Sequence, residues 1–515
     1  MNFSHLSFET ISGKVESYFK SVSRSSYIAV FIIIGIGFLN FGQIATTLIF
    51  NNDGLDRINV DFFAFFYYVE IGRWAYSTIY HFFHFDTPIP FISVAVSVTM
   101  LTLVIIQLWS ILNIKSLFIR VISGSIFLSF PILIHYFFYI GDIEVYSLGM
   151  LLTTSSLILF KHNEYKIGSS VIALNIIALG CYPALFSFIN TLFLLLALQQ
   201  YADTTDLKQS VILFTKGLAI SLCSLVIYFV ITKLLLFAFH LELTDYRGAN
   251  DTSITGLLLE LPEKMLMAFD YFGQLFTQLN PLHRSFLILL FLAFLYYLKP
   301  KTSSATLNWS YPFLALAVII GTVFSTYYIT PKSNLYVGFI FGFLPLLMYL
   351  SKVVLANSNG YLKSTLSIIL ILLISNGIKN NNALTLTHQI NVESSKALAN
   401  NILFEIQKKP NYNMKSSPIV FIGLIENNPH YNFFEPHLDI SILNGMNKPV
   451  GFVHQNRPSR KQCLLRTLNY EVAAFELPQE KYQLKIQEYE NLPLFPEKGS
   501  IVLRADTIFV HLGRH

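Results

Sequence analysis

The sequence predicts a polytopic α-helical membrane protein of about eleven spans that ends in a soluble α/β domain. Hydrophobic residues make up 53% of the 515-residue chain and charged residues only 13%, about half the charged share of an ordinary soluble protein. Mean hydropathy is +0.54. The apolar residues lie in long runs up to residue 378, and a polar asparagine run follows. Composition and patterning therefore agree on the fold class.

A leader, residues 1–26, comes before the first apolar run. Its apolar and basic side chains follow the pattern of an interfacial helix on the cytoplasmic surface, with an irregular tail as the alternative. The first apolar run is too long for a signal-peptide core and no small-residue cleavage site follows it, so we expect an uncleaved span. The three cysteines are scattered, which argues against a disulfide framework.

Apolar runs within residues 27–378 define the membrane domain. The predicted spans are 27–50, 88–112, 121–140, 143–160, 168–182, 184–200, 211–239, 285–298, 310–329, 335–351 and 364–378. Three of them are shorter than the usual crossing length, so re-entrant segments are the alternative for these three.

The charged residues sort by loop, which predicts the orientation. One set of loops is basic and carries Lys14, Lys20, Arg24, Lys115, Arg120, Lys161, Lys166, Lys208, Lys299, Lys301, Lys352 and Lys363. The alternate loops are acidic and carry Asp53, Asp56, Asp61, Glu70, Asp86, Asp142, Glu144, Glu242, Asp245, Asp251, Glu260, Glu263 and Asp270. Basic loops face the cytoplasm. With an odd number of spans, the N-terminus is cytoplasmic and the C-terminal domain lies outside.

Three long segments are then expected outside the membrane, where function concentrates. They are the loops 51–87 and 240–284 and the tail 379–515. In the tail, residues 386–409 have helical spacing. Short apolar runs bounded mostly by Pro, Gly or Asn predict strands; these are Ile419–Ile422, Val472–Leu477, Ile501–Leu503 and Thr507–Leu512.

The segment after the first span carries the most chemistry. Asn52, Asp53, Asp56 and Arg57 put two carboxylates and a guanidinium at the outer surface. The aromatic-rich stretch 61–85 follows and reads as one helix. On that helix Glu70 and Arg73 are three residues apart, so a purely structural ion pair is one interpretation.

The functional interpretation is sugar transfer from a polyprenyl phosphate. That reaction needs a carboxylate to take the proton from the acceptor hydroxyl. It also needs cations to stabilise the departing phosphate, which arginine does with its forked donors. Asp53, Asp56 and Glu70 are therefore the candidate catalytic residues.

At these positions the sequence resembles a known family. Asn52-Asp53 with Arg57, followed by Gly72-Arg73-Trp74, is similar to the signature of bacterial O-antigen glucosyltransferases of the Gtr type. These are serotype-converting enzymes of the GT-C-like class. The turn from Gly180 to Ala184 and the closing segment 492–501 also resemble that family.

The resemblance implies a glucosyltransferase of the bacterial inner membrane that acts on the periplasmic face. The donor would be undecaprenyl-phosphate glucose, made by a donor synthase and moved outward by a donor flippase. The acceptor would be the lipid-linked O-antigen of lipopolysaccharide. Asn52, Arg57, Arg73, Trp74 and Tyr182 would bind substrate. No cofactor or nucleic acid is implied, and the use of a divalent metal is left open.

Two further cations, Arg247 and Lys332, are candidate substrate-binding residues in the outer loops. The alternatives are a solvated loop charge for Arg247 and a snorkelling side chain for Lys332. His81, His84 and Asp86 have metal-like spacing, but an aromatic surface helix explains them without a metal.

Two rival functions stay open. An O-antigen polymerase or another polyprenyl-phosphate-sugar transferase is the first, although loop 240–284 holds more acids than the Arg-rich loop of a polymerase should. A flippase or transporter of lipid-linked sugars is the second. It predicts ionisable residues deep within the spans, where few occur.

Overall fold

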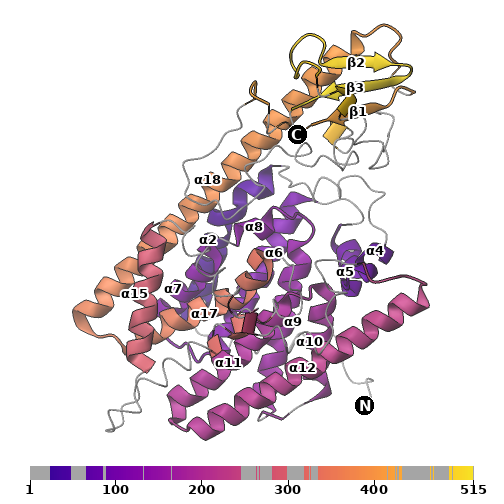
Figure 1. The fold of residues 1–515 in the computed structure, drawn as a ribbon. Helices are drawn as coiled ribbons and strands as arrows, with labels where there is room; N and C mark the ends of the chain where they lie inside the picture. Colours follow the sequence, from indigo (N-terminus) through magenta and orange to yellow (C-terminus); the bar gives the residue numbers. More distant parts are fainter. Residues whose placement is uncertain are drawn as a thin grey trace, which may run out of the picture.

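The computed structural model describes residues 24–47, 65–84, 89–244, 281–298, 318–325, 335–431 and 487–513, with short gaps inside these ranges and isolated positions between them. Within these residues the chain is mostly helical and ends in a small sheet (Figure 1). Three predicted elements lie wholly or mostly outside the described residues: the leader helix, the tail strand Val472–Leu477 and the span 310–329.

Ten helices correspond to the other ten predicted spans. They are α2 (Arg24–Thr46), α6 (Pro90–Ile111), α7 (Leu117–Ser129), α9 (Ile143–His162), α10 (Ser169–Cys181), α11 (Leu185–Thr204), α12 (Leu207–Ala238), α15 (Pro281–Leu298), α17 (Leu335–Asn357) and α18 (Gly360–Gln407). Among the described residues, six helices are long and apolar enough to cross a membrane and four more are shorter apolar helices. The membrane class of the fold is supported, and the total of about eleven spans stays a prediction.

The predicted span 121–140 is wrong in its second half. Helix α7 ends at Ser129, and the short helix α8 (Ile134–Phe137) follows as a separate element. Phe130 is extended, with ψ at 123°, because a residue that precedes a proline, here Pro131, is disfavoured in the helical conformation.

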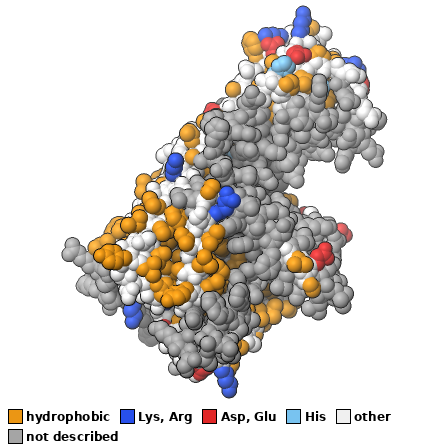
Figure 2. Space-filling view, turned by 60° about the vertical axis from the view of Figure 1, so that its left-hand side comes forward, with side chains coloured by type: hydrophobic (Ala, Val, Ile, Leu, Met, Phe, Trp, Pro, Cys, Tyr) orange, Lys and Arg blue, Asp and Glu red, His pale blue; other side chains and the backbone are white. Residues whose placement is uncertain are grey.

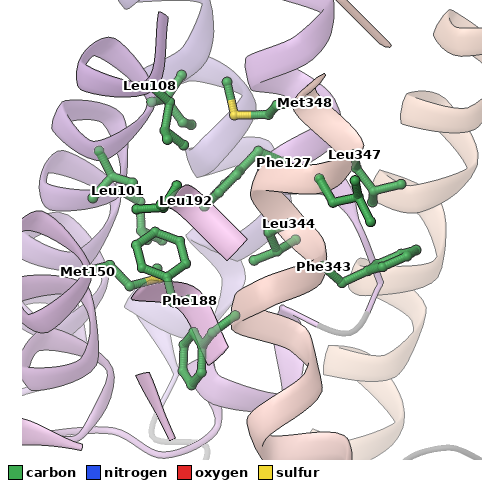
Figure 3. Close-up of a cluster of buried hydrophobic side chains, with 14 of the residues drawn as sticks. Leu101, Leu108, Phe127, Met150, Phe188, Leu192, Phe343, Leu344, Leu347 and Met348 are labelled. Atoms are coloured by element: carbon green, nitrogen blue, oxygen red, sulfur yellow. The ribbon is translucent and has the colours of Figure 1, made fainter. Parts of the chain in front are cut away.

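Close packing of apolar side chains holds the membrane domain together. Figure 3 shows part of this core, where Leu101 and Leu108 of α6, Phe127 of α7, Phe188 of α11 and Leu344 of α17 meet. All five side chains are buried. Helices that are far apart in the sequence thus share one interior, and the ends of these helices are fixed relative to one another.

Several helices of the membrane domain also have an apolar face that points outward. Large hydrophobic side chains are exposed on three of them: Val226, Val230 and Leu234 of α12, Leu289 and Leu292 of α15, and Ile368 and Leu372 of α18. Figure 2 shows apolar side chains gathered over the body below the tail, with charged side chains above and below them. A broad exposed apolar surface is expected of a protein whose solvent is lipid.

Helix α18 joins the membrane domain to the tail without a break. The sequence separated a last span, 364–378, from a tail helix at 386–409, but the structure has one helix of 48 residues, about 70 Å long at 1.5 Å per residue. The asparagine run between them stays helical because Asn381 is buried and its Nδ2 donates to Oδ1 of Asn40 at 2.6 Å. The asparagines therefore make contacts between helices.

The tail contains a three-stranded sheet packed on the end of α18 (Figure 1). Its strands are β1 (Ile419–Ile422), β2 (Ile501–Arg504) and β3 (Thr507–His511), in the order β1-β3-β2, with β1 parallel and β2 antiparallel to β3. Three of the four predicted strands are thereby confirmed.

The two faces of this sheet bury different partners because side chains alternate along a strand. Ile419 and Phe421 of β1 pack in the cluster that contains Ile402 of α18. Val420 and Ile422 point the other way, into a cluster with Tyr489. The sheet is covered on both faces, so the tail has a hydrophobic core of its own.

Neighbouring helices of the membrane domain run in opposite directions, so their ends collect into two groups. We call them the Arg73 end and the Lys161 end. The first contains Arg73, Asp142, Tyr146 and Tyr182, and the second contains Asn113, Lys161, Gln199, Asp203 and Lys352. Asp142 comes directly before helix α9, and Lys161 lies in the last turn of that helix. The length of α9 therefore separates the two groups by about 27 Å. Acidic and basic loop residues predicted on opposite sides of the membrane therefore lie at opposite ends.

Candidate functional site

A break between two short helices places Arg73. Helix α4 (Phe65–Glu70) ends before Gly72, and α5 (Trp74–His84) begins after Arg73. The predicted single helix 61–85 is therefore wrong. Gly72 has φ +76°, a left-handed conformation that glycine adopts without steric cost.

A tyrosine of α12 fixes this break. Tyr228 is buried, and its hydroxyl donates to the carbonyl oxygen of Gly72 at 2.7 Å. A Cβ added at Gly72 would collide with that hydroxyl. The turn separates Glu70 from Arg73, and among the described residues no ion pair joins them. The structural interpretation of the two as an i, i+3 pair is not supported.

The Arg73 side chain extends over an aromatic ring. Its Cζ lies 4.6 Å from the centroid of the Tyr182 ring, within the range of a cation–π interaction. Its Nη1 donates to the hydroxyl of Tyr146 at 3.4 Å. Tyr182 follows the last residue of α10, and Tyr146 stands in the first turn of α9. Two segments that are distant from Arg73 in the sequence therefore position its guanidinium.

A buried carboxylate completes this chain of contacts. Asp142, only 1% exposed, comes directly before α9. Its Oδ2 accepts a hydrogen bond from Tyr146 at 3.0 Å, and its Oδ1 accepts one from the hydroxyl of Tyr76 on α5. Glu144, two residues later, is 0% exposed. Burial of a carboxylate is costly unless it is paired or hydrogen-bonded, and the two tyrosine hydroxyls supply those hydrogen bonds to Asp142.

Aromatic rings form the wall behind these groups. Tyr146 and Tyr182 are 4.4 Å apart, Tyr136 is 4.7 Å from Phe341, and Phe341 is 5.7 Å from Tyr182, measured between ring centroids. All four side chains are buried. Aromatic rings are large and rigid, so this wall keeps the Tyr182 face under Arg73 in place.

Trp74 lies beside the arginine and packs on Gly180. A Cβ added at Gly180 would approach Cζ2 of Trp74 to 2.6 Å, so glycine is required there for the indole ring to fit. The buried indole N–H has no hydrogen-bond partner among the described residues. It is thus a donor that a bound ligand could use.

The structure brings together three residues that the sequence singled out: Arg73, Trp74 and Tyr182. Glu70 is half-buried at the end of α4, and its carbonyl oxygen accepts from the backbone N–H of Thr244 at 3.0 Å. This bond ties the start of the second predicted outer loop to the first. Six other candidates lie outside the described residues: Asn52, Asp53, Asp56, Arg57, Arg247 and Lys332.

Tyr76, Asp142 and Tyr146 belong to the site although the sequence does not mark them as site residues. One signal was present, since Asp142 and Glu144 are two acids spaced by one residue at the start of a span. Tyr76 and Asp142 are 66 residues apart, and Arg73 and Tyr146 are 73 residues apart, so only tertiary structure reveals the cluster. Within the described part of the chain, no group of three or more His, Cys, Asp or Glu side chains could hold a metal.

The fold and this cluster define a polytopic helical membrane protein with a polar site at one end of its helices. A family model described as glucosyl transferase GtrII matches residues 46–378, and the chain belongs to this family. The chain is therefore a glycosyltransferase, and the resemblance to Gtr-type enzymes is confirmed for the membrane domain. The match ends before the tail, so the resemblance of segment 492–501 stays a prediction. Neither the comparison with curated proteins nor that with solved structures finds a match.

Proposed function

We propose that the protein transfers glucose from undecaprenyl-phosphate glucose to a sugar of lipid-linked O-antigen on the periplasmic side of the inner membrane. In this reaction the acceptor hydroxyl attacks C1 of the glucose. The bond from C1 to the phosphate oxygen breaks, undecaprenyl phosphate leaves, and the hydroxyl proton passes to a carboxylate. The proposal is supported by the family and by the location of Arg73 at one end of an apolar helical domain.

The geometry of Arg73 is the observation on which the proposal depends most. Its planar fork of N–H donors matches the oxygens of a phosphate, and its positive charge pairs with the negative charge that the donor phosphate carries when it binds. The aromatic face of Tyr182 lies under it, and Trp74, the next residue in the chain, packs on Gly180. A polyprenyl tail could remain between helices, in lipid, while its phosphate reaches this cation.

Asp53 is the proposed base that accepts the proton, with Asp56 and Glu70 as further acids of the same loop. Asn52 and Arg57 of that loop, and Arg247 and Lys332 of later loops, are proposed as additional contacts to sugar or phosphate. All seven of these residues are predicted to lie outside the membrane, on the side of the Arg73 end.

The proposed orientation puts the Lys161 end in the cytoplasm and the Arg73 end and the tail in the periplasm. Basic loops at the Lys161 end support it, as does the continuous α18, whose start follows a predicted cytoplasmic loop. A reporter fused after residue 515 should be active only in the periplasm. Activity in the cytoplasm would overturn the orientation and, with it, the proposed reaction.

The direct test is the variant Asp53→Asn in cells that make the O-antigen. We expect it to abolish glucosylation while the protein remains inserted at the wild-type amount. The matched control is Asp203→Asn at the Lys161 end, which should leave glucosylation unchanged. Wild-type modification of the O-antigen by Asp53→Asn would overturn the assignment of the base. If the wild-type protein adds a different sugar or joins whole O-antigen units, the transferase class stands and the substrate assignment fails.

A further inference from the structure

We infer that Asp142 is a positioning residue that holds the guanidinium of Arg73 in place for the donor phosphate, acting through the hydroxyl of Tyr146. The inference rests on the proposed function, because it assigns to Arg73 the donor phosphate as its ligand. It adds to the site a carboxylate and two tyrosines, Tyr76 and Tyr146, that neither the sequence nor the family description assigns.

The contacts form a directed chain. Arg73 donates from Nη1 to the Tyr146 hydroxyl at 3.4 Å, and that hydroxyl donates to Oδ2 of Asp142 at 3.0 Å. A hydroxyl oxygen that receives a hydrogen bond becomes a better donor, so each bond in the chain strengthens the next. The negative carboxylate thus acts on the positive guanidinium through one phenol.

This series of hydrogen bonds is rigid because most of the side chains that form it are buried. Tyr76, Asp142 and Tyr146 are 0%, 1% and 4% exposed. The Tyr76 ring stacks on that of Tyr68 at 4.1 Å, with 15° between the planes. On the other side, the Tyr146 ring lies 4.4 Å from that of Tyr182, the ring that carries Arg73. Neither tyrosine can turn away from Asp142 without disturbing this packing.

The hydrogen bonds of Asp142 favour a positioning role over proton transfer. Each carboxylate oxygen already accepts a hydrogen bond from a tyrosine hydroxyl, Oδ1 from Tyr76 and Oδ2 from Tyr146. A base that must take a proton from an acceptor sugar needs an oxygen within hydrogen-bond reach of that sugar. The carboxylate is 1% exposed and is covered by the residues that it orients.

The backbone of Arg73 is held independently. Tyr228 of α12 donates to the carbonyl oxygen of Gly72, one residue before the arginine. Two buried tyrosines from different helices therefore fix the two ends of the same residue, the main chain through Tyr228 and the guanidinium through Tyr146. Loss of the side-chain contact alone should loosen the guanidinium without moving the main chain.

The expected signature is a change in donor binding that exceeds the change in turnover. Asp142→Asn replaces one carboxylate oxygen with an N–H₂ donor, which cannot accept from a tyrosine hydroxyl. One of the two tyrosine bonds is then lost. We expect the KM for undecaprenyl-phosphate glucose to rise about tenfold, with kcat changed less than about threefold, as for a loss of uniform substrate binding. Tyr146→Phe, which removes the connecting hydroxyl, should give the same split, and Asp142→Glu should restore part of the donor affinity.

The experiment measures KM and kcat for glucose transfer by the full-length protein in lipid vesicles, with undecaprenyl-phosphate glucose as donor. Asp203→Asn and Tyr412→Phe are the matched controls, a carboxylate at the Lys161 end and a tail tyrosine whose buried hydroxyl has no partner among the described residues. Both should behave as wild type.

The outcomes separate the two claims. If the wild-type protein does not use this donor, the proposed function fails, whatever the variants do. If the wild-type protein uses this donor, two results overturn the positioning role. In the first, Asp142→Asn behaves like Asp203→Asn; in the second, it lowers kcat at unchanged KM. Should Asp142→Asn fail to fold, Tyr146→Phe decides alone, since it keeps the carboxylate and the Tyr76 bond.

Discussion

The two ends of the membrane domain both combine a cation with a carboxylate, but they use the charges differently. At the Lys161 end, the lysine donates to the carbonyl oxygens of Ser110 and Ile111 and to Oδ1 of Asn113, at 3.0 to 3.3 Å. Lysine there caps the last turn of α6. At the Arg73 end, the arginine lies 4.6 Å from the centre of an aromatic ring and contacts a tyrosine hydroxyl.

The carboxylates differ in the same way. Asp203 accepts from two carboxamides, Nδ2 of Asn113 at 3.0 Å and Nε2 of Gln199 at 2.7 Å, and Gln199 in turn accepts from Lys352. Asp142 accepts from two tyrosine hydroxyls instead. Carboxamides link helices at the Lys161 end, whereas at the Arg73 end rigid phenols orient one planar cation. The difference shows how a cation and a carboxylate that contact each other only through other groups can stabilise a fold at one end and prepare a site at the other.

The Lys161 end also contains a tyrosine that stays neutral. Burial, and next the charge of Asp203, raise the pKa of Tyr165, just beyond the end of α9. A phenol with a raised pKa does not ionise in the physiological range. This agrees with a structural role for that end.

The largest effect should come from Arg73→Lys. Lysine keeps the charge but loses the planar fork and the stacking on Tyr182. We expect glucose transfer at a fixed, low donor concentration to fall about 100-fold, which corresponds to about 2.7 kcal/mol. Transfer rates at equal amounts of inserted protein measure it. Lys161→Arg, the reverse exchange at the opposite end, is the control, and equal losses in both variants would remove the distinction between the ends.

A smaller effect is expected from Gly72→Ala. The new side chain would sit at φ +76° and collide with the Tyr228 hydroxyl, a strain of about 1 to 3 kcal/mol. Thermal unfolding in detergent should show lower stability, and transfer should fall about tenfold because the turn before Arg73 moves. Gly35→Ala is the control, since no atom lies within 4 Å of its Cβ position. Unchanged stability and transfer in Gly72→Ala would show that the turn does not fix the arginine.

Gly180→Ala should act through Trp74. The added methyl group would come 2.6 Å from the indole ring, so the ring must shift. We expect transfer to decrease a few-fold, by about 1 kcal/mol, together with a change in the fluorescence of Trp74. Gly42→Ala has open space around its Cβ position and should change neither. A fluorescence change without any loss of transfer would exclude Trp74 from the site.

The smallest effect on activity should come from Asp203→Asn. Loss of this acceptor removes hydrogen bonds to Asn113 or Gln199, so stability should fall by about 1 kcal/mol. Transfer by the protein that remains folded should match the wild type. A loss of transfer as large as that of Asp142→Asn would mean that both ends take part in the reaction.

Much of the fold could be predicted because single-sequence signals determine it. Long apolar runs predict the spans, and ten of the eleven predicted spans overlap a helix of the structure, although the second half of 121–140 does not belong to the helix α7. Strands β1, β2 and β3 follow from short apolar runs between Pro, Gly and Asn. The failures lie where a contact between helices decides. Asn381 stays helical because Asn40 accepts its hydrogen bond, and the helix 61–85 breaks at Gly72, where Tyr228 contacts its carbonyl oxygen.

The site was predictable only in part for the same reason. Arg73, Trp74 and Tyr182 carried a family-like signature, and the structure brings them together. The charge pattern predicts that Asp142 lies outside the membrane, but it does not mark Asp142 as a site residue, because the partner Tyr76 is 66 positions away. A single sequence does not show which acidic residue of the acidic loops is buried in the same cluster as an arginine.

The central claim is that the Arg73 end transfers glucose to O-antigen. Mass analysis of lipopolysaccharide sugars tests it most directly, in cells without this gene, with the wild-type gene and with Arg73→Ala at equal protein amount. We expect an additional glucose on the O-antigen only with the wild-type gene. Identical sugar masses with and without the gene, or full glucosylation by Arg73→Ala, would contradict it.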